Sequence, residues 1–84
     1  MARINYADPE MIREINELRK RGIKRFICDC WTDTKFYKPV IKGTAQGISA
    51  YANAMFAKHG DSTTVVVSYL DKEFKLHEYC TYHA

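Results

Sequence analysis

The order of one helix and two β-rich runs occurs twice along this chain, although the sequence itself contains no internal repeat. The first helix is expected over residues 9–21, because Pro9 suits a first helical position and Gly22 suits a left-handed C-terminal residue. Asp8 can accept hydrogen bonds from the first backbone N–H groups. Four apolar residues recur at helical spacing and form one stripe: Met11, Ile12, Ile15 and Leu18. Such a helix needs a partner surface to bury that stripe.

The next two runs, 23–31 and 35–41, are predicted to form a hairpin. Thr32-Asp33-Thr34 between them is a turn candidate. Pro39 cannot donate a ladder hydrogen bond, so the second run belongs at the edge of a sheet. Alternation in the first run divides its side chains between two faces, with Phe26, Cys28 and Cys30 on one and Ile27, Asp29 and Trp31 on the other.

The second unit repeats this order. Thr44 is a plausible N-cap for a helix that ends at Gly60. Two β-rich runs follow at 63–70 and 73–82, and Asp71-Lys72 between them is short enough for a tight hairpin. In the last run, Phe74 and Leu76 alternate with Lys75 and His77, which predicts one apolar and one polar face.

The order of elements is therefore α-β-β-α-β-β. A chain of 84 residues is too short for two separate cores, so we expect a single domain over residues 1–84. The predicted fold is α+β, with two helices packed on one face of a mainly antiparallel four-stranded sheet. The other face of the sheet is then open to water and is the natural functional surface.

The second predicted helix is unusual because Lys58 is its only permanently charged residue between Thr44 and His59. A surface helix normally carries more charge on its wet face. Besides its larger apolar stripe it has a stripe of small residues, a possible helix interface: Gly47, Ala50, Ala54 and Ala57. We expect this stripe to be covered by the chain itself, by a second copy in a homodimer, or by a partner.

Positive charge is concentrated in the middle of the chain. Residues 19–58 carry nine Lys or Arg against Asp29 and Asp33, although the whole chain has a net charge of only +3. Aromatic residues interleave with these cations, and both kinds of side chain are frequent in binding hot spots. The candidate partner-binding residues are Arg19, Lys20, Arg21, Lys24, Arg25, Trp31, Lys35, Tyr37, Lys38 and Lys42. A protein partner with an acidic surface fits this pattern.

A nucleic acid is the alternative partner for segment 19–42. Lysine and arginine neutralise phosphates, and aromatic rings stack on unpaired bases. The sequence matches no helix-turn-helix, zinc-finger or RNA-recognition-motif signature. The modest net charge and the acidic ends of the chain favour the protein partner.

The residues with metal-binding or nucleophilic chemistry do not form a standard pattern: Cys28, Cys30, His77, Cys80 and His83. On a regular strand His77 and Cys80 point to opposite faces, so they cannot share an ion without a bulge. We therefore expect no metal and no cofactor. No known signature of a nucleophilic cysteine surrounds any of the three thiols, so we expect no enzymatic activity.

Neither a membrane span nor a signal peptide is recognisable in the sequence. The odd number of cysteines is unlike the even-numbered framework of a secreted, disulfide-linked domain, so the expected location is the cytoplasm. Small proteins without catalytic groups are often inhibitors or regulators, including those encoded by phages and other mobile elements. The sequence therefore predicts an inhibitor or regulator that acts by protein–protein contact.

Overall fold

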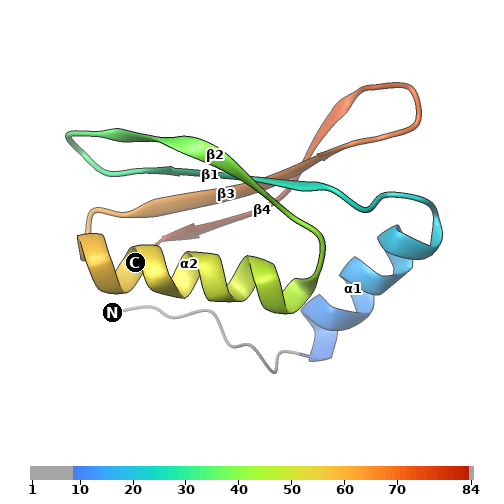
Figure 1. The fold of residues 1–84 in the computed structure, drawn as a ribbon, viewed down its shortest axis with the longest axis horizontal. Coiled ribbons are helices and arrows are strands. Elements are labelled where there is room, and N and C mark those ends of the chain that lie inside the picture. Colours follow the sequence, from blue (N-terminus) through green and yellow to red (C-terminus); the bar gives the residue numbers. More distant parts are fainter. Residues whose placement is uncertain (1–8, 84) are drawn as a thin grey trace.

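The computed structural model describes residues 9–83, which form two helices and a four-stranded sheet. The helices lie on one side of the sheet (Figure 1). The elements are α1 (Pro9–Lys20), β1 (Phe26–Trp31), β2 (Phe36–Lys42), α2 (Ala45–His59), β3 (Thr64–Leu70) and β4 (Leu76–His83). The strand order is β2-β1-β3-β4, and every pair is antiparallel. The predicted α+β fold and its element order are confirmed, and β2 lies at the sheet edge as Pro39 required.

The helix ends depend on local chemistry. The Thr44 hydroxyl accepts a hydrogen bond from the Gly47 N–H at 3.0 Å, which makes it the predicted N-cap of α2. Gly22 and Gly60 come after the two helices at φ of 94° and 79°, a region that disfavours residues with a Cβ. Asp8, the predicted cap of α1, lies outside the described residues.

The core lies between the sheet and the two helices. Phe26, Cys28 and Cys30 of β1 are buried on this covered face, as the alternation predicted. Val65 and Val67 pair with Cys30 and Cys28 from the neighbouring strand β3. The helices contribute Ile15, Ile48, Ala52 and Phe56, all of them buried. These contacts bury the apolar stripes that favoured both helices in the first place.

Helix α1 packs against a side of α2 that carries small residues. This side is not the small-residue stripe that the sequence predicted. The Met11 sulfur accepts hydrogen bonds from the Ser49 hydroxyl and from the Tyr82 hydroxyl, each at 3.5 Å. Ala45 and Ser49 are buried there. By contrast, Gly47 is half-buried, and Ala50, Ala54 and Ala57 are exposed. The described part of the chain does not cover these three alanines, so coverage by a second copy or a partner stays a prediction.

The last hairpin differs from its prediction. The turn runs from Asp71 to Lys75 rather than over two residues, because the Asp71 N–H donates to the Lys75 carbonyl at 3.0 Å. Strand β4 therefore begins only at Leu76. Phe74 belongs to the turn and Leu76 is exposed, so the predicted apolar face does not face the core.

Two β-bulges shift the pairing of the outer strands. Asp29 of β1 opposes two residues of β2, Lys38 and Pro39, and Tyr79 of β4 is an extra residue opposite β3. The second bulge brings His77 and Cys80 to the same face, since they pair with Tyr69 and Val67. This bulge is the exception that the sequence argument allowed, so strand alternation does not separate these two side chains.

Enlarging a buried small residue of α2 should destabilise the fold, and enlarging an exposed one should not. We expect Ala52→Leu to lower the free energy of unfolding by about 1–3 kcal/mol, because Ala52 is fully buried and a larger side chain in a packed core forces its neighbours to move. The matched control Ala54→Leu, on the exposed stripe, should stay within about 0.5 kcal/mol of the parent. Urea denaturation monitored by circular dichroism measures both; equal losses would contradict the placement of α2.

Candidate functional site

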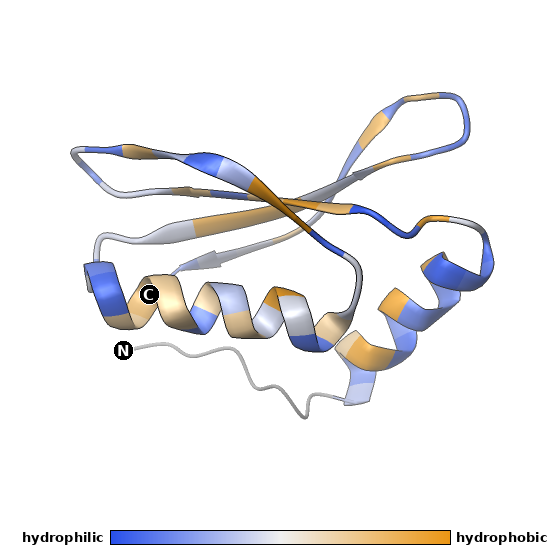
Figure 2. Cartoon of the chain, in the orientation of Figure 1, coloured by the Kyte–Doolittle hydropathy of each residue, from blue (hydrophilic) through white to orange (hydrophobic). Residues whose placement is uncertain are grey.

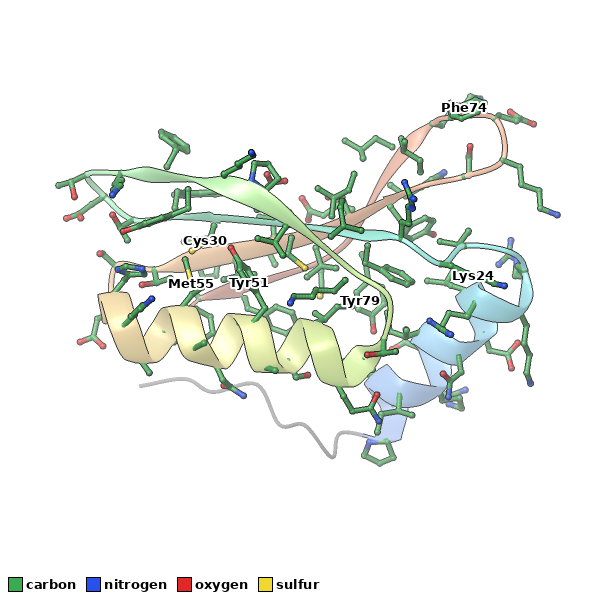
Figure 3. The ribbon with its side chains drawn as sticks, viewed as in Figure 1. Lys24, Cys30, Tyr51, Met55, Phe74 and Tyr79 are labelled. Carbon is green, nitrogen blue, oxygen red and sulfur yellow. The ribbon has the colours of Figure 1, made fainter. Side chains whose placement is uncertain are left out.

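The face of the sheet opposite the helices carries an unusual amount of exposed apolar surface, and we call it the open face. Figure 3 shows Phe74 standing above the sheet on this side, while Cys30, Tyr51, Met55 and Tyr79 lie between the sheet and the helices. Figure 2 shows a strongly hydrophobic stretch of β2 at the end nearer α1. The large exposed apolar residues are Phe36, Ile41, Leu70, Phe74 and Leu76, at 81%, 52%, 44%, 82% and 65% exposure.

Strand alternation explains why these side chains point away from the helices. Ile41 pairs with Ile27, and Leu70 pairs with Leu76. Each of these four residues lies one position along its strand from a residue that faces the helices, so its own side chain points the other way. Trp31 and Phe36 pair at the other end of the hairpin, with their rings 6.1 Å apart. The open face therefore has an aliphatic end near α1 and an aromatic end at the β1–β2 turn.

The aliphatic end contains a groove, which segments distant in the sequence build together. Its cavity volume is about 480 Å³. It lies where the α1–β1 connection meets the β3–β4 turn; the side-chain Cε of Lys72 comes within 3.9 Å of the position of a Cβ on Gly22. The lining residues are Gly22, Ile23, Lys24, Arg25, Ile27, Ile41, Leu70, Asp71 and Phe74.

The groove combines an apolar floor with a cationic rim. Ile27, Ile41 and Leu70 supply the floor, while Lys24 and Arg25 are exposed at the rim. The single carboxylate of the lining, Asp71, is already engaged by three hydrogen-bond donors. A ligand with apolar groups and negative charge is complementary to this combination.

The Asp71 carboxylate organises the β3–β4 turn. One oxygen accepts hydrogen bonds from the N–H groups of Glu73 and Lys75, at 2.8 and 2.9 Å. The other lies 2.7 Å from the His77 Nε2. The hydrogen bond with His77, together with these two backbone bonds, lowers the pKa of Asp71 below its usual range, because each favours the charged form.

One group of the predicted partner-binding residues lies beside this groove. Lys24 and Arg25 line it, and Arg19, Lys20 and Arg21 lie at the C-terminal end of α1. The Arg19 guanidinium donates a hydrogen bond to the Gly43 carbonyl, so it joins α1 to the β2–α2 connection. Lys20 lies 3.7 Å from Glu17 in an exposed ion pair, which contributes little to stability.

The other predicted residues lie elsewhere. Lys35 and Lys38 are at the opposite end of the β1–β2 hairpin, and the six residues of β1 between the two ends span roughly 20 Å. Tyr37 is on the covered face, where its ring stacks on His59 at 4.5 Å. Lys42 also points to that side, with its Nζ 6.0 Å from the Tyr51 ring centroid. The predicted basic and aromatic residues therefore do not form one continuous surface.

Reasoning from residue types misses the apolar part of the site. The sequence indicates Ile41 only as a strand residue, and it predicts an apolar strand face for Phe74 and Leu76. One feature of the sequence does indicate apolar residues on the open face: in the first strand, Ile27 and Trp31 occupy the face opposite the core residues. What the sequence does not contain is the loop geometry that places Phe74 in the lining of the same groove as Ile41.

The three cysteines are free, and their surroundings hold them in the thiol form. Burial raises the pKa of Cys28 and of Cys80 to about 11, and it also raises the pKa of Cys30. Cys28 and Cys80 flank Val67 on opposite sides of β3, so their backbones are about 10 Å apart, too far for a disulfide. A nucleophilic cysteine needs the opposite shift.

The histidines have partners other than a metal. His77 contacts Asp71, and the His83 Nδ1 lies 3.2 Å from the Thr64 hydroxyl. Within residues 9–83, no group of three His, Cys, Asp or Glu side chains is arranged to hold a metal ion. None of the helices in this part of the chain has the length and apolarity to cross a membrane.

The chain was compared with family models, curated proteins and solved structures, and none of the three comparisons found a match. The function is therefore inferred from the geometry and chemistry of the described residues.

The raised thiol pKa values predict slow alkylation. At neutral pH, iodoacetamide should modify the folded chain far more slowly than the urea-unfolded chain, and the rate should rise as the pH approaches 11. Since the folded pKa exceeds the ordinary value of 9.0, the thiols' contribution to stability is present below pH 9 and is lost as the pH rises towards 11. Mass spectrometry of alkylated peptides measures the rates; rapid modification of Cys80 in the folded chain would contradict this assignment.

The lowered pKa of Asp71 should depend on His77. We expect His77→Ala to raise it towards 3.8, because the variant loses the largest cause of the shift, while His83→Ala on the same strand leaves it unchanged. Since the folded pKa is depressed, the carboxylate's contribution to stability is present above pH 3.8 and is lost as the pH falls through the folded value. NMR titration of the side-chain carboxyl carbon measures this pKa, and identical values in both variants would contradict the contact.

Proposed function

We propose that this chain is a non-enzymatic cytoplasmic binding protein that inhibits or regulates a protein partner, which it binds through the open face. One observation carries the proposal: large apolar side chains gather on a sheet face that neither helix covers. Exposed apolar patches are typical of interaction sites. The groove lined by Ile27, Ile41, Leu70 and Phe74, at the aliphatic end of this face, is the part that we assign to the partner.

Charge specifies the kind of partner. The rim cations Lys24 and Arg25 have no acidic neighbour in an ion pair among the described residues. A partner segment that carries Asp or Glu beside apolar side chains pairs with this rim and fills the groove. An aliphatic floor favours such a segment over a nucleic acid, because bases stack on aromatic rings rather than on isoleucine and leucine.

The absence of catalysis is part of the proposal. The buried or half-buried thiols support it, because burial raises their pKa and a nucleophilic cysteine needs a lowered one. None of the three cysteines lines the groove.

The aromatic end of the open face supports a second candidate function. The ring centroids of Trp31 and Phe36 lie 6.1 Å apart, and the same hairpin carries the exposed cations Lys35 and Lys38. Aromatic rings with neighbouring lysines are a stacking platform for single-stranded nucleic acid. This site and the groove lie at opposite ends of β1, so separate variants distinguish them.

A peptide library tests the main proposal. Short peptides displayed on phage are selected against the full chain, and the enriched peptides are synthesised and titrated by fluorescence polarisation. We expect enrichment of peptides that mix Asp or Glu with Leu, Ile or Phe. Ile41→Asp should weaken their binding about tenfold or more, because it places a carboxylate on the apolar floor. Ser62→Asp, which adds the same charge at an exposed position of the α2–β3 connection, should leave the affinity unchanged.

Charge reversal at the two ends of the open face is a second test of the proposed function. Lys24→Glu/Arg25→Glu should weaken peptide binding, whereas Lys35→Glu/Lys38→Glu, with the same change in net charge, should have little effect. A mixed-sequence single-stranded oligonucleotide serves as the competing probe. If the oligonucleotide binds with steep salt dependence and Lys35→Glu/Lys38→Glu removes that binding, the nucleic-acid function replaces the main proposal.

A further inference from the structure

Phe74 has a backbone conformation that its side chain disfavours. Its φ is 63°, and among residues 9–83 it is the one residue other than glycine with a positive φ. This left-handed region is disfavoured by a Cβ, and glycine or asparagine is the usual occupant of such a turn position. Phe74 is therefore a strained residue at the tip of the β3–β4 turn.

Folding does not explain the phenylalanine. Its side chain is 82% exposed, so the ring gains little from burial. The bonds that define the turn use its backbone and not its ring: the Phe74 N–H donates to the Asp71 carbonyl at 3.0 Å. Glycine or asparagine would keep that bond and relieve the strain. Strain that the fold does not require points to a role for the side chain itself.

Hydrogen bonds of the Asp71 side chain order the turn that carries Phe74. The Asp71 carboxylate binds the N–H groups on both sides of it, those of Glu73 and Lys75. The same carboxylate contacts His77, whose ring stacks on Tyr69 at 5.2 Å. Tyr69 in turn packs edge-on against the buried Phe26 at 6.0 Å. A chain of contacts therefore connects the turn to the core of the sheet.

We infer that Phe74 is a preorganised hot spot of the partner interface. Its ring forms one wall of the groove, against which an apolar side chain of an acidic partner segment packs, while the segment's carboxylates face Lys24 and Arg25. The inference rests on the proposed function of the open face. Since Asp71 orders the turn when the chain folds, binding does not bear the entropy loss of ordering it. Aromatic anchors of this kind dominate many interfaces.

Substitution at Phe74 should separate stability from binding. We expect Phe74→Gly and Phe74→Asn to raise the thermal unfolding midpoint, because both residues tolerate a positive φ. The affinity for the selected acidic–apolar peptides should fall roughly tenfold. Phe36→Asn, at a phenylalanine of nearly equal exposure with a regular strand backbone, should not change peptide affinity. A lower unfolding midpoint in Phe74→Gly overturns the inference, since the ring then serves folding.

The two proposals fail in distinguishable ways. If Ile41→Asp abolishes peptide binding and Phe74→Asn retains it, the open face is the binding site and the role of Phe74 is overturned. If both variants bind like the parent, the proposed function of the open face is wrong as well.

A third variant tests preorganisation. Asp71→Ala keeps Phe74 but removes the side-chain bonds that order the turn. We expect lower heteronuclear NOE values at residues 72–75 and a severalfold loss of peptide affinity. A mobile turn with unchanged affinity overturns the preorganised part of the inference.

Discussion

The antiparallel pairing of β1 with β3 at the centre of the sheet determines both which side chains form the core and which remain exposed. Phe26, Cys28 and Cys30 of β1 face the helices together with Val65 and Val67 of β3. Because side chains alternate along a strand, this arrangement sends Ile27 and Trp31 to the opposite face. Both helices lie on the first face, so no element of residues 9–83 covers the second face. The core and the open face are consequences of the same register.

The two helices cover their face by packing against each other as well as against the sheet. Met11 of α1 receives hydrogen bonds from Ser49 of α2 and from Tyr82 of β4, so a single sulfur contacts two other elements. This contact takes the Ala45 and Ser49 side of α2 out of water. The neighbouring helix thus explains part of the scarcity of charge on α2. The side of α2 that it covers is not the small-residue stripe that the sequence indicated.

The open face presents its apolar groups on two kinds of support. Ile27, Ile41 and Leu70 are held on regular strands, whereas Phe74 stands on a turn ordered by the Asp71 carboxylate. A floor on strands and a wall on an ordered turn together make a surface that is formed before any partner arrives. Lys24 and Arg25 at its rim give that surface a preference for negative charge.

The sequence by itself determined the element order, the edge position of β2, the caps at Thr44, Gly22 and Gly60, and the residues of β1 that face the core. These features depend on local chemistry: helix capping, the missing N–H of Pro39 and strand alternation. Its candidate binding residues include Lys24 and Arg25, which line the groove. The tertiary structure alone decided which side of α2 is buried, where the bulges fall, and that Phe74 and Ile41 line one groove on the open face. The physical reason is that these outcomes depend on contacts between segments far apart in the chain, such as those that bring Lys24 and Phe74 to one groove, which no local pattern of residues encodes.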